Sequence, residues 1–260
     1  MPICRRTPAL PMLPVIRGRR FVLVAAASIT LAGPVQAEVS FDRPGIGFGT
    51  TVLESGQFSW EQGLPDFSRD RRDRQSEQLY TASTLWRLGL GKRVELQLGA
   101  DLLNRQSGNP TETGAGDASL ALKYALPDLS PLWSWALLAS YSHPTGQQPF
   151  RADHPSRSLA VSLARELSEG RSFAWYLDYS SSDGDDSWTF SPSYTFYSDA
   201  GFSAYTELGF SSGAEHSTNA GAGGVWRLSA QLQLDVWFLR GISQNATDWQ
   251  GGFGIAWTPD

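Results

Sequence analysis

The chain has 260 residues, of which 41% are hydrophobic and 18% charged, and its formal net charge is −5. Its 26 acidic residues outnumber its 21 lysines and arginines, so it lacks the basic footprint that binding to nucleic-acid phosphates requires. Cys4 is the single cysteine, so no disulfide within the chain can hold the fold together.

Residues 1–37 have the three-part pattern of a cleaved export signal. Five arginines and no acidic residue precede an apolar run over residues 21–32, and Val35-Gln36-Ala37 predicts cleavage after Ala37. The run is shorter than the roughly 20 residues that cross a bilayer as a helix. Met12 is an alternative start that would give a signal of ordinary length. Without the five arginines, 16 basic residues face 26 acidic ones, a net charge near −10.

Apolar and polar residues alternate from about residue 50 to Trp257. In residues 94–102, VELQLGADL, every second residue is apolar and the residues between them are Glu, Gln, Gly and Asp. Side chains of a strand point to opposite faces in turn, so this period predicts strands with one apolar face. Helical spacing is absent. We predict twelve strands, near residues 51–63, 77–88, 93–103, 116–126, 132–142, 157–167, 171–180, 187–197, 201–210, 219–228, 231–240 and 248–257.

The connections between these strands alternate in length. Short turns are expected at residues 89–92, 127–131, 168–170, 198–200 and 229–230. Longer loops are expected near residues 64–76, 104–115, 143–156, 181–186, 211–218 and 241–247. Short periplasmic turns, longer extracellular loops and an even strand number are typical of an outer-membrane β-barrel. A soluble β-sandwich, the alternative on composition, has no reason to sort its connections in this way.

Aromatic residues are placed near both ends of the predicted strands, with Leu and Val between them, as expected for girdles at the two membrane interfaces. Near the turns these are Trp86, Tyr124, Trp133, Trp135, Phe173, Phe196, Phe202, Trp226 and Trp257. Near the loops they are Tyr141, Tyr179, Trp188, Phe210, Phe238 and Trp249. Pro192 lies inside a strand and cannot donate a ladder hydrogen bond, so we expect a bulge there.

We therefore predict an all-β fold: one transmembrane antiparallel β-barrel over residues 51–260, preceded by a periplasmic or lumen segment, residues 38–50. Five short motifs, in order, resemble the outer-membrane family named for the putative MetA pathway of phenol degradation, whose members are labelled transporters. They are DRPG at 42–45, WRLGLGKRVEL at 86–96, GDASLALKY at 116–124, SHPTG at 142–146 and the last strand, 248–257. The chain departs from the family in continuing three residues past Trp257. The resemblance implies a barrel and a transport role, without a demonstrated substrate.

Candidate sites for chemistry are few. His143, His154 and His216 all fall in predicted loops. A site at His154 with Asp153 and Ser156 would resemble that of a lipid-modifying barrel enzyme, but such trios are common in polar loops. The acidic run 183–186 lacks the twelve-residue calcium-loop pattern, so we interpret it as a solvated tip. The run 69–74 could contact lipopolysaccharide phosphates, although a solvated loop of mixed sign is the simpler interpretation. We predict no catalytic residues, no metal site and no cofactor.

The polar faces of the strands supply the candidate lumen residues. These are Arg87, Glu95, Asp101, Asp117, Lys123, Asp178, Glu207, Arg227 and Asp235. Ionisable residues at membrane depth face a cavity or one another, so they either cross-link the wall or line an aqueous route. Six acids against three bases would favour cations in an open route. Whether the segment Glu38–Gly49 blocks the lumen is left open.

The function that this pattern favours is a non-enzymatic channel or uptake barrel of the cell outer membrane for small molecules, with aromatic compounds implied by the family label. The alternatives are a closed structural barrel that acts through its loops and, third, a lipid-modifying enzyme. Expected partners are outer-membrane lipid, lipopolysaccharide, the barrel assembly machinery and a small-molecule solute, and not nucleic acid.

Overall fold

The structure is a computed structural model that describes residues 39–72, 75–213 and 216–259. The predicted export signal lies outside these residues. The strands are β1 Phe58–Arg72, β2 Gln75–Gly89, β3 Val94–Ser107, β4 Glu112–Gly114, β5 Ala118–Ala125, β6 Trp133–His143, β7 Ser156–Ser168, β8 Arg171–Ser182, β9 Asp185–Ser198, β10 Phe202–Ser212, β11 Ser217–Arg227, β12 Leu232–Gly241 and β13 Trp249–Trp257. No helix in the described residues is long and apolar enough to cross a membrane.

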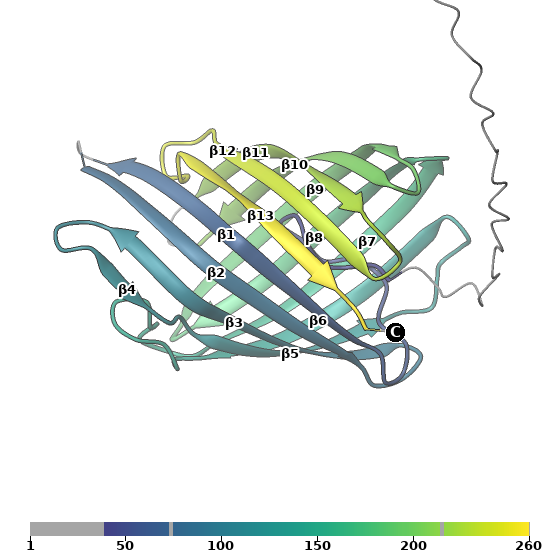
Figure 1. The fold of residues 1–260 in the computed structure, drawn as a ribbon, viewed down its shortest axis with the longest axis horizontal. Coiled ribbons are helices and arrows are strands. Elements are labelled where there is room, and N and C mark those ends of the chain that lie inside the picture. Colours follow the sequence, from purple (N-terminus) through teal and green to yellow (C-terminus); the bar gives the residue numbers. More distant parts are fainter. Residues whose placement is uncertain (1–38, 73–74, 214–215, 260) are drawn as a thin grey trace, which may run out of the picture. The chain divides into compact units, whose positions relative to one another are not determined.

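These strands form one closed antiparallel sheet (Figure 1). Apart from β4 and β5, neighbours in sequence pair with each other, and β1 closes the ring by pairing with β13, with Trp60 opposite Trp257. The short β4 and the longer β5 both pair with β3 and share one position in the ring. The described strands therefore fill twelve positions, as the sequence predicts. Closure gives the backbone groups of the strands partners and leaves no free edge, which a membrane-spanning sheet requires.

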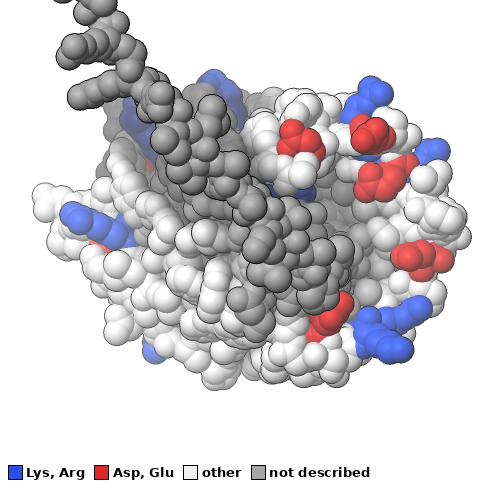
Figure 2. Space-filling view, turned by 45° about the vertical axis from the view of Figure 1, so that its right-hand side comes forward, with Lys and Arg blue, Asp and Glu red and all other residues white. Residues whose placement is uncertain are grey.

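The barrel is apolar outside and charged inside. Leu98 and Leu122 are 43% and 47% exposed, whereas the largest fully buried side chains belong to polar residues. These are Arg87, Lys123, Glu61, Glu95 and Ser59. A soluble protein buries apolar side chains and exposes charged ones, so this inverted arrangement fits a barrel whose outer face meets lipid. In Figure 2, turned toward the end that carries the C-terminus, charges gather around that end and the flank is largely uncharged.

Aromatic side chains contact each other near both ends of the strands. At the end with the short turns (the turn end), the rings of Trp133 and Trp175 stack with centroids 5.7 Å apart. At the opposite end (the loop end), the ring centroids of Phe238 and Trp249 are 4.9 Å apart. This arrangement matches the two predicted girdles.

The first strand differs from the prediction. We expected a strand over residues 51–63 followed by a loop over 64–76, but β1 extends from Phe58 to Arg72 and β2 begins at Gln75. The reason is a shift of register between Gly63 and Asp66, which takes Pro65 out of the ladder and lets the strand continue beyond it. The predicted loop over 181–186 is also wrong, because only Asp183 and Gly184 separate β8 from β9.

The bulge expected at Pro192 is absent. Pro192 lies opposite Trp175 of β8 without a shift of register. On the side of β10, the residues between Phe190 and Ser193 have no partners. The register of β9 against β10 is the same before and after this gap. A proline can interrupt a ladder in this way because it has no N–H to donate.

Candidate functional site

We call the residues that precede β1, 39–57, the N-terminal segment. Its first part lies inside the barrel (Figure 1), and its last residues reach the turn end, where Gly56 and Gln57 bond to Gly89. Strands from several sides hold it. Ser162 of β7 donates a hydrogen bond to the carbonyl of Phe48 (Oγ–O 2.6 Å), and Arg87 of β2 donates one to the carbonyl of Ser40 (Nη1–O 2.9 Å). The hydroxyls of Thr50 and of Ser134 on β6 are 2.7 Å apart. The segment therefore occupies part of the lumen.

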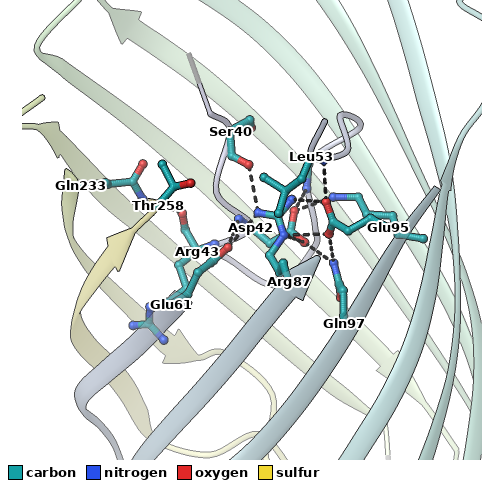
Figure 3. Close-up of polar contacts among 12 residues, drawn as sticks. Ser40, Asp42, Arg43, Leu53, Glu61, Arg87, Glu95, Gln97, Gln233 and Thr258 are labelled. Carbon is teal, nitrogen blue, oxygen red and sulfur yellow. Dashed lines mark hydrogen bonds and ion pairs between the residues drawn. The ribbon is translucent and has the colours of Figure 1, made fainter. Parts of the chain in front are cut away.

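Asp42 is bound by basic and polar side chains of the wall (Figure 3). Lys123 Nζ lies 2.7 Å from Asp42 Oδ1, and Gln97 Nε2 donates to Asp42 Oδ2 at 2.8 Å. Arg87 Nε lies 3.7 Å from the same Oδ2. Burial alone would raise the pKa of Asp42, but the charges of Arg87 and Lys123 outweigh it and hold this pKa below its ordinary value. Asp42 is therefore an anion in a basic pocket of the wall.

Arg43, the next residue, is bound by two acids. Its Nη2 lies 2.9 Å from Asp66 Oδ1 and 3.3 Å from Asp235 Oδ1. Ser83 and Trp237 also donate hydrogen bonds to the Asp66 carboxylate. Burial alone would lower the pKa of Arg43, but the two carboxylates raise it well above its ordinary value. The segment thus places one charge of each sign against a complementary site on the wall.

Carboxylates of the wall also capture the backbone of the segment. Glu61 accepts hydrogen bonds from the backbone N–H groups of Asp42 and Arg43, at 3.0 and 2.8 Å. Further along the segment, the N–H of Ile46 donates to Glu207 at 3.0 Å.

Arg87 joins Glu61 to a third carboxylate that binds the backbone of the segment, Glu95. Arg87 Nη1 lies 2.8 Å from Glu61 Oε1, and Arg87 Nε lies 2.7 Å from Glu95 Oε1. Glu95 in turn accepts the N–H of Leu53 at 2.8 Å. These buried charges need partners because a bare ion is costly inside a protein, and the segment supplies some of them.

We use the name socket for a set of wall residues whose side chains bind the N-terminal segment: Glu61, Asp66, Arg87, Glu95, Gln97, Lys123, Ser134, Ser162, Glu207, Gln233 and Asp235. Five of the nine lumen residues expected from the sequence belong to it, namely Arg87, Glu95, Lys123, Glu207 and Asp235. The sequence analysis missed the others. The alternating pattern could have indicated Gln97 and Gln233, whereas Glu61 and Asp66 belong to the strand whose bounds were predicted wrongly.

The other four expected residues lie elsewhere. Asp117 accepts hydrogen bonds from the N–H groups of Gly146 and Ala152 and so holds the loop between β6 and β7. The carbonyl of Asp101 accepts the N–H of Gly116. Asp178 is half-buried on the inner face of β8. Arg227 donates to the carbonyl of Asp199 in the β9–β10 turn, at 2.8 Å.

A cavity of about 360 Å³ lies beside the segment. Its wall comes from β7 to β12 and consists largely of small or hydroxyl-bearing side chains, including Ser191, Ser193, Thr195 and Ser203. Tyr205 and Glu207 also line it. The segment therefore does not fill the lumen completely, and the space left beside it is polar.

The loop residues that the structure describes show no comparable arrangement. His154 Nε2 lies 3.2 Å from Asp183 Oδ2, but both side chains are more than half exposed. No group of three or more His, Cys, Asp or Glu side chains in the described residues could hold a metal ion.

The family model described as "Putative MetA-pathway of phenol degradation" matches residues 41–258, a span that includes Asp42 and Arg43. No curated protein matches the sequence. Among solved structures, an outer membrane channel from Pseudomonas putida F1 has a TM-score of 0.64 at 14% identity, covering 84% of this chain and 99% of that one.

Two porins are also similar. The KdgM porin has a TM-score of 0.56 at 8% identity and covers 78% of this chain and 99% of its own. The NanC porin has a TM-score of 0.53 at 10% identity, covering 76% and 97%. These similarities confirm the predicted outer-membrane β-barrel fold. Together with the apolar outer face, they place the chain in the cell outer membrane.

Proposed function

Because the chain belongs to the family described as "Putative MetA-pathway of phenol degradation", we propose that it is a channel or uptake barrel for small molecules, closed by its own N-terminal segment. Passage of a solute then requires the segment to move within the socket or to leave it. Small molecules are the proposed solute class, and only the family's description points to aromatic compounds among them.

The observation that carries this proposal is the nature of the lumen filling. A barrel with a purely structural role can fill its interior with side chains of its own wall, as small barrels do. Here Lys123, a buried base of the wall, reaches Asp42, and Asp235, a buried acid of the wall, reaches Arg43, both in a segment that belongs to no strand. A coil held by side chains can be displaced without breaking the backbone ladder of the barrel.

The cavity beside the segment supports the same proposal. It is lined on the wall side by β7 to β12 and on the other side by residues 39–49 of the segment. Displacement of the segment would join this cavity to the space that the segment occupies. The resulting passage would have hydroxyl-bearing side chains on one side and the charged socket on the other, a lining suited to water and polar solutes.

A closed structural barrel is the second candidate. The observation in its favour is the number of contacts that hold one residue, since Arg43 has ion pairs to both Asp66 and Asp235. We propose no enzymatic activity, because His154 pairs with Asp183 at an exposed loop tip that does not enclose a substrate.

Single-channel recording in a planar bilayer tests the proposal. The purified protein should conduct weakly or in brief openings, and a variant that lacks residues 39–50 should conduct more and stay open. Heat-modifiable migration on a gel would show that both proteins are folded. If neither conducts, the lumen is closed by other means and the structural-barrel candidate replaces the channel.

A further inference from the structure

In the charged run at the end of β1, the acidic side chains and the arginines Arg69 and Arg71 point to opposite faces of the sheet. Asp66 points into the lumen, where it binds Arg43. The register of β1 against both of its neighbours is regular from Asp66 onward, so side chains alternate strictly between the two faces. Asp70 therefore shares the inner face with Asp66, and Arg69 and Arg71 point outward.

Two further arginines share this outer face. Arg240 of β12 lies opposite Trp249 of β13, which lies opposite Arg69. The guanidinium of Arg240 is 4.3 Å from the Trp249 ring centroid. Arg105 of β3 lies opposite Tyr80 of β2, an exposed aromatic residue.

We call Arg69, Arg71, Arg105 and Arg240 the arginine patch. It lies on the outer face over β12, β13, β1, β2 and β3 at the loop end, roughly 20 Å across at about 4.8 Å per strand.

The patch carries one sign of charge. All four arginines are exposed, and none forms an ion pair with another described residue. The described acids on these strand ends lie on the other face. Glu77 pairs with the inward Asp70, and Glu112 lies opposite Gln106, which neighbours the outward Arg105.

Exposed apolar side chains adjoin the patch on the same outer face. Leu102 and Leu103 of β3 are each 50% exposed, and Phe253 of β13 is 60% exposed. Cations bordering apolar side chains are complementary to a phosphorylated lipid, with its phosphates at the water boundary and its acyl chains in the bilayer. Guanidinium groups suit phosphate because their planar forks bind its oxygens in pairs.

We propose that the arginine patch binds the phosphate groups of lipopolysaccharide in the outer leaflet. This inference does not depend on whether the lumen conducts. For residues 69–71 it replaces the interpretation as a solvated loop of mixed sign. Alternation along β1 turns the side chains of Arg69 and Arg71 outward and that of Asp70 inward, where its carboxylate accepts a hydrogen bond from the Arg71 N–H at 3.0 Å.

Native mass spectrometry of the purified protein tests this, with bis-phosphorylated lipid A, dephosphorylated lipid A and inorganic phosphate as separate probes. The test variant carries Arg69→Gln, Arg71→Gln, Arg105→Gln and Arg240→Gln. The control carries Lys92→Gln, Arg93→Gln, Arg165→Gln and Arg171→Gln, which removes the same charge from the turn end. The control includes a close match for Arg240, since Arg165 lies 5.2 Å from the ring centroid of Trp133.

The test variant should bind bis-phosphorylated lipid A about tenfold or more weakly, through loss of charge-assisted hydrogen bonds, and the control should bind it as the wild type does. Dephosphorylated lipid A should bind weakly to all three proteins. The proposal would be overturned if the control lost as much affinity for bis-phosphorylated lipid A as the test variant does. It would also be overturned if the wild type bound dephosphorylated and bis-phosphorylated lipid A equally well. Competition by inorganic phosphate as strong as that by lipid A would also overturn it, in favour of a free-anion site. If the fourfold variant does not fold, Arg71→Glu alone must weaken binding.

Discussion

Arg43 Nη2 lies 3.3 Å from Asp235 Oδ1, although 192 residues separate the two along the chain. The contact joins the N-terminal segment to β12, close to the C-terminal strand that closes the barrel. The complete binding site for Arg43 therefore exists only when β12 and β13 have joined β1. Docking of the segment and closure of the barrel are coupled through this ion pair.

Arg43→Gln should release the segment and destabilise the protein. It leaves Asp66 and the fully buried Asp235 without their shared cation, and breaking a buried pair from one side costs about 3–5 kcal/mol. Reversible unfolding in lipid measures the stability, and limited proteolysis of residues 39–57 measures the release. Adding Asp66→Asn and Asp235→Asn to this variant should restore the stability of the barrel but not the docking. If the segment resists proteolysis in Arg43→Gln as well as it does in the wild type, Arg43 does not hold the segment.

Leu122→Arg should cost about 2–4 kcal/mol, because Leu122 faces lipid. Ser119→Arg, on the inner face of the same strand, should cost much less. Ala121 and Gln97, the inward neighbours of Leu122 and Leu98, are poor controls, because Ala121 is only 9% exposed and Gln97 binds Asp42. Equal costs at Leu122 and Ser119 in reversible unfolding would mean that the faces of β5 are wrongly assigned.

Removal of residues 39–50 should raise the preference for cations. The segment brings Arg43 to Asp66 and Asp235, so its loss exposes their negative charge to the passage, where a narrow lumen focuses the field. Reversal potentials in a salt gradient measure this preference. In the shortened protein, Asp235→Asn should lower the preference for cations. In the intact protein, the same substitution should act mainly by loosening the segment. A shortened protein that selects anions would contradict this assignment.

Acid should favour release of the segment. A group whose folded pKa is lowered adds stability that is complete above its ordinary pKa and is lost as pH falls through the lowered value. For Asp42 this loss occurs below 3.8, where protonation weakens its contacts with Lys123 and Arg87. Open times recorded as the pH falls from neutral to well below the ordinary pKa of Asp42 should lengthen in the wild type. Asp42→Asn, which cannot titrate, should give long openings throughout, and a wild-type profile in this variant would exclude Asp42 as the cause.

The barrel could be predicted from the sequence because its two faces meet different surroundings. In β3 and β12, lipid on one side and polar groups on the other impose a period of two that is visible residue by residue. β1 was misjudged because its outer half extends past the apolar belt. There Arg69, Asp70 and Arg71 give no apolar face to follow, and Pro65 resembles the start of a loop.

The socket could be predicted only in part. Alternation placed Arg87, Glu95, Lys123, Glu207 and Asp235 on the polar face, but it does not say what a polar face contacts. Their partners lie in a coil without periodicity, and the pairing of Asp42 with Lys123 spans 81 residues. Such contacts depend on the closed barrel, which brings distant strands around one segment.

A reversible disulfide between the segment and the wall tests most directly whether the segment closes the lumen. The hydroxyls of Thr50 and Ser134 are 2.7 Å apart, so Thr50→Cys with Ser134→Cys should form a disulfide that fixes the segment in the socket. Ser140→Cys with Ser158→Cys, whose hydroxyls are also 2.7 Å apart, is the matched control within the wall. Single-channel conductance should fall in the first protein on oxidation and return on reduction, with no change in the control. Equal conductance of the oxidised and reduced forms of the first protein would contradict closure of the lumen by the N-terminal segment.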